Sequence, residues 1–294
     1  MLQFQNYPLY IVYSLHSQQA VEPLWGQYSR ELTNARKRAV EDLFKLDFSK
    51  FRRDLEVASE KDRLIDAVFQ WQVEEDLQPK YKTEIEAYEK AIQRTLTIFS
   101  HTSIGKALLD QFNPKIKTWI IPANWKESVA KTQLATDEQG GGIRIMFSPE
   151  AFSNVYVGPR SVGSAVEDTL FHELVHAMRF SQERFFNKNL IKWEFSHSSE
   201  EFIAEQFANV YHSSRRESDF YGTYKGPYKT KKEMYQYLAE DAELVMALKF
   251  FLKTEPLAKF VVHLKQPDYN PFRDYNEIEA RALRIFGVDK FMDF

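Results

Sequence analysis

A chain of 294 residues, 44% of them hydrophobic and 28% charged, is long enough to bury the core of one large domain or two smaller ones. Its 39 basic residues nearly balance its 42 acidic residues, and the formal charge of −3 argues against a dedicated role in binding nucleic acid or membrane surfaces. The absence of cysteine excludes disulfides, cysteine-ligated zinc and a thiol nucleophile, so any metal must be held by histidine and carboxylate side chains.

The first 20 residues do not resemble a Sec signal peptide. They interrupt their apolar residues with polar ones such as Gln3, Asn6 and His16, and they contain neither a basic stretch nor a small-residue cleavage site. No run of about 18 apolar residues predicts a membrane span anywhere in the chain. We therefore expect a protein made in the cytoplasm, with any export using a route that does not read such a signal.

Residues 27–100 are dense in charge and poor in glycine, which is typical of helices with solvated faces. The pattern predicts a mainly helical N-terminal region over residues 1–100, interrupted near Pro79. A packed helical subdomain is the simplest interpretation, and a role in substrate recognition or delivery is the alternative. The apolar residues that recur at helical spacing are Tyr81, Ile85, Tyr88, Ile92, Leu96 and Phe99.

The pattern changes after Ser100, where a short helix over residues 103–112 is followed by two β-rich segments. The first covers residues 116–121, and the second, over residues 143–147, places Ile143, Ile145 and Phe147 at alternating positions. These segments predict neighbouring strands of a sheet with one face buried.

Two helices are predicted next. Ser164 and Glu167 form a capping box at the head of the first, whose core-facing residues are Val166, Leu170, Leu174, Ala177 and Met178. The second begins near Ser198, and its alanines allow close approach to another helix. Further helices are expected over residues 234–251 and 278–286, the latter before Gly287, with a break at Pro256.

The first of these helices carries the sequence His172-Glu173-Leu174-Val175-His176, an HExxH motif. Residues four apart lie on the same face of a helix, so His172 and His176 can direct two imidazole nitrogens to one zinc ion. Glu173 projects beside the pair, where it can accept the proton of a metal-activated water and return it to a leaving amine.

A catalytic zinc of this kind needs a third protein ligand. Residue 182 is glutamine rather than histidine, which excludes the metzincin pattern. The second helix offers Glu200, Glu201 and Glu205, of which Glu201 is the predicted ligand. Glu205, one turn later, can accept the remaining N–H of a ligating histidine, whereas Glu200 points about 100° away and is expected to be solvated.

The segments 171–177 (FHELVHA) and 201–205 (EFIAE) resemble the gluzincin site of anthrax lethal factor and related bacterial toxin and effector metallopeptidases. That resemblance implies Glu201 as ligand and Glu205 as its support. The order of elements over residues 103–176 is also similar to that of secreted type III effector peptidases. One departure is that relatives often carry a tyrosine shortly before the third ligand, and none lies between His176 and Tyr211. His197 is a candidate oxyanion donor in its place, with a solvated helix cap as the alternative interpretation.

Together these features predict an α+β protein whose zincin-like metallopeptidase domain, over residues 101–294, packs a small sheet on the motif helix. The expected cofactor is one zinc ion per chain, and the expected reaction is hydrolysis of peptide bonds in a protein or peptide substrate. The strand over residues 143–147 is expected to lie along the cleft, as the edge strand of zincins does, and to hold the substrate backbone. The resemblance implies a bacterial effector or toxin protease, exported by a specialised secretion system.

Two other functions fit the same residues. A zinc amidase acting on cell-wall peptides would share every metal-site residue, and a non-catalytic zinc-binding interaction protein could keep the zincin fold. Glu173 argues against the latter, because a purely structural zinc site needs no base beside an open position. The sequence leaves the substrate and the oligomeric state open.

Overall fold

A computed structural model shows the chain divided into two compact units. The first unit holds a five-stranded sheet, and the second holds most of the helices. The predicted α+β class is therefore confirmed. No helix in the described part of the chain is both long and apolar enough to cross a membrane. The structure describes residues 2–12, 82–121, 130–134, 142–147, 166–184, 199–215, 220–222, 225–228 and 230–287.

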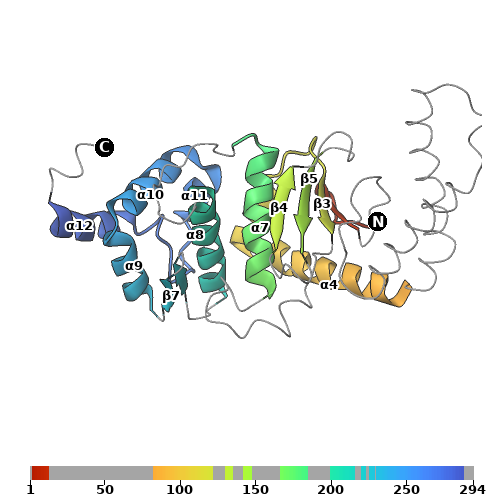
Figure 1. Ribbon diagram of the computed structural model, residues 1–294, viewed down its shortest axis with the longest axis horizontal. Coiled ribbons are helices and arrows are strands. Elements are labelled where there is room, and N and C mark those ends of the chain that lie inside the picture. The colour runs from red at the N-terminus through yellow and green to blue at the C-terminus, as the bar shows by residue number, and fades with distance from the viewer. Residues whose placement is uncertain are drawn as a thin grey trace, which may run out of the picture. The chain divides into compact units, whose positions relative to one another are not determined.

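The larger sheet is mixed, with strand order β1-β2-β3-β5-β4 (Figure 1). Its three central strands β2, β3 and β5 are parallel, and β1 and β4 pair antiparallel with their neighbours. The pairing of β3 with β5 confirms that the two β-rich segments after Ser100 are neighbours. The strands are β1 (Leu2–Gln3), β2 (Leu9–Ile11), β3 (Thr118–Ile121), β4 (Lys131–Leu134) and β5 (Ile143–Met146).

Strand β5 differs from its prediction in two ways. It lies between β3 and β4, so the expectation that it forms the edge along a cleft is wrong, and β4 is the last strand on that side among the described residues. All four of its residues are buried, including Arg144 at 3% exposure, so the expectation of one exposed face is also wrong for this strand. A central parallel strand is covered on both faces, which its short alternating pattern did not reveal.

Residues 2–12 contribute two strands that the sequence pattern did not predict. Farther along, helix α4 (Lys82–Ser100) confirms the helical spacing that ends at Phe99. The hydroxyl of Tyr88 donates a hydrogen bond of 2.9 Å to the carbonyl of Phe147 and so ties this helix to the end of β5. Residues 13–81, with the break near Pro79, lie outside the described residues, and the division of the chain at residue 100 stays a prediction.

The second unit consists of helices and a two-stranded hairpin. The predicted helix over residues 234–251 is two helices, because Asp241 accepts hydrogen bonds from the N–H groups of Glu243 and Leu244 and starts a new one. The predicted break at Pro256 and stop at Gly287 are confirmed. The elements are α5 (Ser103–Leu109), α7 (Val166–Ser181), α8 (Ser199–Ser214), β6 (Phe220–Gly222), β7 (Lys225–Tyr228), α9 (Lys231–Ala239), α10 (Ala242–Thr254), α11 (Pro256–Val261) and α12 (Tyr275–Phe286).

Helix α7 lies in the core of this unit. An aromatic cluster joins it to its neighbours: Phe171 stacks on Tyr211 of α8 with ring centres 4.5 Å apart, and Phe99 meets both rings edge-on. Tyr211 is therefore a core residue. The predicted core-facing residues whose burial is described are all fully buried, and they are Leu170, Leu174, Ala177 and Met178.

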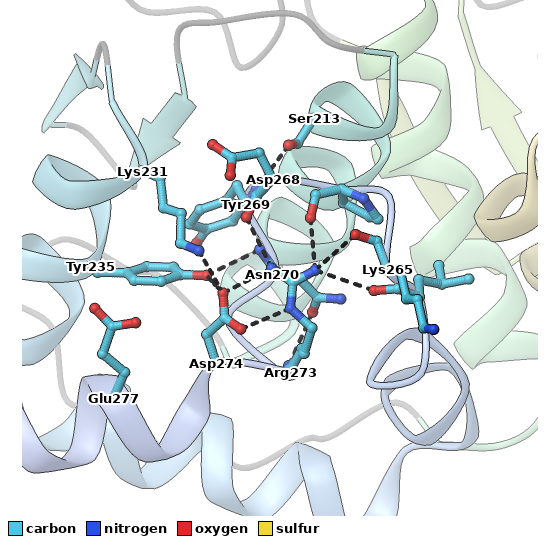
Figure 2. A network of polar contacts seen from close by, with 12 residues as sticks. Ser213, Lys231, Tyr235, Lys265, Asp268, Tyr269, Asn270, Arg273, Asp274 and Glu277 are labelled. Carbon is cyan, nitrogen blue, oxygen red and sulfur yellow. Dashed lines mark hydrogen bonds and ion pairs between the residues drawn. The ribbon is translucent and has the colours of Figure 1, made fainter.

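A network of polar contacts organises the C-terminal part of the unit around Arg273 (Figure 2). Its guanidinium donates to backbone carbonyls of the loop before it, including that of Pro267 at 2.8 Å, and to the carboxylate of Asp274. The hydroxyl of Tyr235 on α9 donates to the same carboxylate at 2.6 Å and accepts a hydrogen bond from the N–H of Asn270. These contacts fix the loop that leads into α12.

Candidate metal centre

Helices α7 and α8 lie side by side (Figure 1), and the contacts at their two ends show that they run antiparallel. At one end of the pair Asp168 of α7 contacts His212 of α8 at 2.7 Å, and at the other end Arg179 of α7 contacts Glu200 of α8 at 2.8 Å. The backbones can approach closely because Ala204, together with other small residues, is buried in α8, as its sequence predicted. The acidic residues in the first turn of each helix also suit the helix dipole.

The motif histidines face the start of α8 between these two contacts. The Nε2 atoms of His172 and His176 lie 3.0 Å apart. One carboxylate oxygen of Glu201 lies 3.1 Å from Nε2 of His172, and the other lies 3.4 Å from Nε2 of His176. The sequence-predicted ligands are thus brought together by the helix pair.

These separations fit a tetrahedral metal ion. Bonds of about 2.0 to 2.1 Å to a tetrahedral zinc place neighbouring ligand atoms about 3.3 to 3.4 Å apart. The two Nε2 atoms are 3.0 Å apart, and each of them has a different oxygen of the Glu201 carboxylate at 3.1 or 3.4 Å, so each pairwise contact is near this value. Among the residues that the structure describes, this is the one group of three or more potential ligands, and it could hold a metal ion.

The electrostatic surroundings of the group favour a positive charge. Burial of the imidazole lowers the pKa of His172, but the hydrogen bond to Glu201 and the charge of that carboxylate outweigh this effect, giving a pKa of about 9. The charges of Glu173 and Glu205 act in the same direction. Burial raises the pKa of Glu201, but its contacts with both histidines hold that pKa well below the usual range.

The group is open to solvent on one side. The side chain of Glu201 is 43% exposed, while those of His172 and His176 are 12% and 7% exposed. From Ser199 to Ser213, Glu201 is the one residue of α8 that is not buried. A metal ion held here would therefore keep a side accessible to water or a substrate, which a catalytic site requires.

The predicted general base, Glu173, is buried beside these ligands and contributes to the raised pKa of His172. The predicted hydrogen bond from a ligating histidine to Glu205 is not formed. Neither Nδ1 atom of His172 and His176 has a hydrogen-bond partner in the described part of the chain, so neither donates to Glu205. Glu205 acts on His172 through its charge instead. His197, the candidate oxyanion donor, lies outside the described residues.

The prediction that Glu200 is solvated is wrong. Its side chain is fully buried and accepts two hydrogen bonds of 2.8 Å from the guanidinium of Arg179. Sequence reasoning also missed Arg179, although a signal was present: it is a single arginine three residues after His176, on the same side of an otherwise apolar helix segment.

Comparison of the chain with protein families, with curated proteins and with solved structures finds no match. Its function must therefore be inferred from the residues of the candidate centre and their geometry.

Proposed function

We propose that the protein is a zinc-dependent metallopeptidase of the gluzincin type, with His172, His176 and Glu201 as metal ligands. The observation that carries the proposal is the convergence of two histidine nitrogens and one carboxylate from two helices, with each nitrogen within 3.4 Å of a carboxylate oxygen, which is near the ligand spacing of a tetrahedral zinc site. The zincin-like fold and the resemblance to bacterial toxin and effector peptidases are part of the same proposal.

When bound, zinc would supply a Lewis acid that lowers the pKa of a coordinated water to about 7 and polarises a carbonyl group. Glu173 accepts the proton of the attacking water and returns it to the leaving amine. Because Glu173 follows His172 on α7, its carboxylate lies near the ligands but is not itself a ligand. Because the side chain of Glu201 is partly exposed, a substrate can approach the centre from this side with its scissile bond.

Glu173 favours catalysis over a purely structural zinc site. Its carboxylate is buried next to the ligand group, where a negative charge is costly unless it acts on a nearby positive charge. A structural site of two histidines and a carboxylate has no use for this second acidic group.

The experiment that tests the proposal compares wild type with Glu173→Gln. We expect both proteins to purify with about one zinc per chain, and the variant to cleave an unstructured protein substrate about 10² to 10⁴-fold more slowly. Glu240→Gln, which changes an exposed glutamate at the end of α9, is the matched control and should cleave like wild type. Zinc-loaded wild type that leaves a broad set of peptides intact would instead favour a non-catalytic zinc protein.

A further inference from the structure

Arg179 occupies a fully buried site at the end of α7, next to the candidate metal centre. Every side of its guanidinium is engaged. Nε and one terminal nitrogen donate to the two oxygens of Glu200 at 2.8 Å, the other terminal nitrogen donates to Glu255, and a further hydrogen bond of 2.9 Å reaches the carbonyl of Arg184. Its face lies 5.4 Å from the ring centre of Phe251.

This cluster joins three helical segments: the end of α7, the start of α8, and Glu255 between α10 and α11. Glu200 and Glu255 are 0% and 2% exposed, so two carboxylates share one buried guanidinium, with Arg184 placed 3.7 Å from Glu255. Apolar residues of similar volume often give equal or greater stability than a buried ion cluster. What such a cluster adds is a directional contact, which fixes how the helices meet.

The direction of the contact between Arg179 and Glu200 matters because Glu200 is next to Glu201 in the chain. An α-helix advances about 1.5 Å and turns about 100° per residue, so a small slip or rotation of α8 would carry the Glu201 carboxylate away from the histidines. A two-pronged contact between a planar guanidinium and a carboxylate restrains both movements. It does so one turn beyond His176, on the same side of α7.

We propose that Arg179 is the positioning residue of the metal centre: by holding Glu200 it sets the register of α8 on α7 and aims Glu201 at His172 and His176. This inference rests on the proposed function, since it assigns Arg179 a role toward the same metal ligands.

Two variants test the proposal. Arg179→Lys keeps the charge but cannot hold two oxygens of Glu200 in a planar fork. A triple variant, Arg179→Met with Glu200→Leu and Glu255→Leu, replaces the cluster with apolar residues and keeps the test valid if the single variant does not fold. Tyr235→Phe is the matched control, because the buried Tyr235 makes two hydrogen bonds through its hydroxyl, to Asp274 and from the N–H of Asn270, that lie in the same unit but outside the α7–α8 pair.

The readouts are the zinc dissociation constant, the visible absorption of the cobalt-loaded protein, which reports coordination geometry, and the melting temperature of the metal-free protein. We expect the folded cluster variants to bind zinc about 10 to 100-fold more weakly and to show an altered cobalt spectrum. The Tyr235→Phe control should keep both wild-type values even where its melting temperature falls.

Wild-type zinc affinity and an unchanged cobalt spectrum in the folded cluster variants would overturn the role of Arg179 while leaving the metal centre intact. Wild-type protein that binds neither metal would overturn the metal centre itself, and the positioning role with it. The two failures are therefore distinguishable by the wild-type titration alone.

Discussion

The three carboxylates near the start of α8 have different partners, although they come from one short segment. Glu201 faces the motif histidines, Glu200 binds Arg179 inside the protein, and Glu205 contributes its negative charge to the surroundings of His172. Helical geometry separates them, since neighbours along the chain point about 100° apart. Substitutions of the three residues should therefore have different effects on the proposed metal centre.

Removing the carboxylate of Glu201 should weaken metal binding more than any other single change on α8. We expect Glu201→Ala to raise the zinc dissociation constant by more than about 100-fold, because a direct ligand contributes more than the outer contacts whose loss costs about 10 to 100-fold. Competition with a chromogenic chelator measures this constant. Glu277→Ala, at an exposed position of α12, serves as the control, and equal affinities for the two variants would remove Glu201 from the ligand set.

Asp274 provides a residue-level test of the fold at acid pH. Burial raises its pKa, but hydrogen bonds from Arg273, Tyr235 and Lys231 outweigh that effect and hold the pKa well below its ordinary value of 3.8 (Figure 2). A lowered pKa stabilises the folded state at pH values above the unfolded pKa, and this contribution is lost as the pH falls through the folded value.

Asp274→Asn should therefore lower the free energy of unfolding at pH 7 by about 1 to 2 kcal/mol, and the variant should unfold at a lower urea concentration than wild type. This is the low end of the range for charged hydrogen bonds, because the site is partly exposed. The difference should shrink once the pH drops below about 3.8. Urea unfolding at several pH values measures it. A difference that stays constant down to pH 2 would contradict the pKa assignment.

At the scale of elements, the boundary between α9 and α10 depends on one cap. The side chain of Asp241 accepts hydrogen bonds from the N–H groups of Glu243 and Leu244, which have no partner inside the helix. Asp241→Ala should lower the free energy of unfolding by about 1 kcal/mol, whereas Asp241→Asn should change it by only a few tenths. Chemical denaturation of the two variants checks this, and equal losses would show that the cap does not stabilise the junction.

The helices of the second unit could be predicted largely from local patterns, but contacts between them could not. The spacing of His172 and His176 and the face that carries Glu201 follow from the helical period alone. The burial of Glu200 does not, because its partner Arg179 lies 21 residues earlier in the chain and on another helix. A single-helix argument assigns such a carboxylate to solvent.

At the scale of the whole molecule, the sheet shows the same limit over a longer distance. Strand β2, at residues 9–11, pairs in parallel with β3, at residues 118–120. The sequence pattern of a three-residue strand is too short to predict a partner so distant in the chain. The alternation over residues 143–147 indicated a strand correctly, yet it could not indicate that the strand is central. Sheet order depends on pairings between distant segments.

Metal binding should also be visible in the stability of the protein. A ligand that binds only the folded state adds about 2.7 kcal/mol at a concentration 100 times its dissociation constant. For a chain of this size we expect chelation of zinc to lower the melting temperature by about 4 °C. Calorimetry with and without chelator measures the shift, and His176→Ala should melt at one temperature under both conditions.

The measurement that tests the central claim most directly is an equilibrium zinc titration of the metal-free wild-type protein beside His172→Ala. We predict one tight site per chain in wild type and its loss in the variant, because the Nε2 atom of His172 is one of the three converging ligand atoms. Wild-type protein that binds no zinc, or a variant that binds it as tightly, would contradict the account.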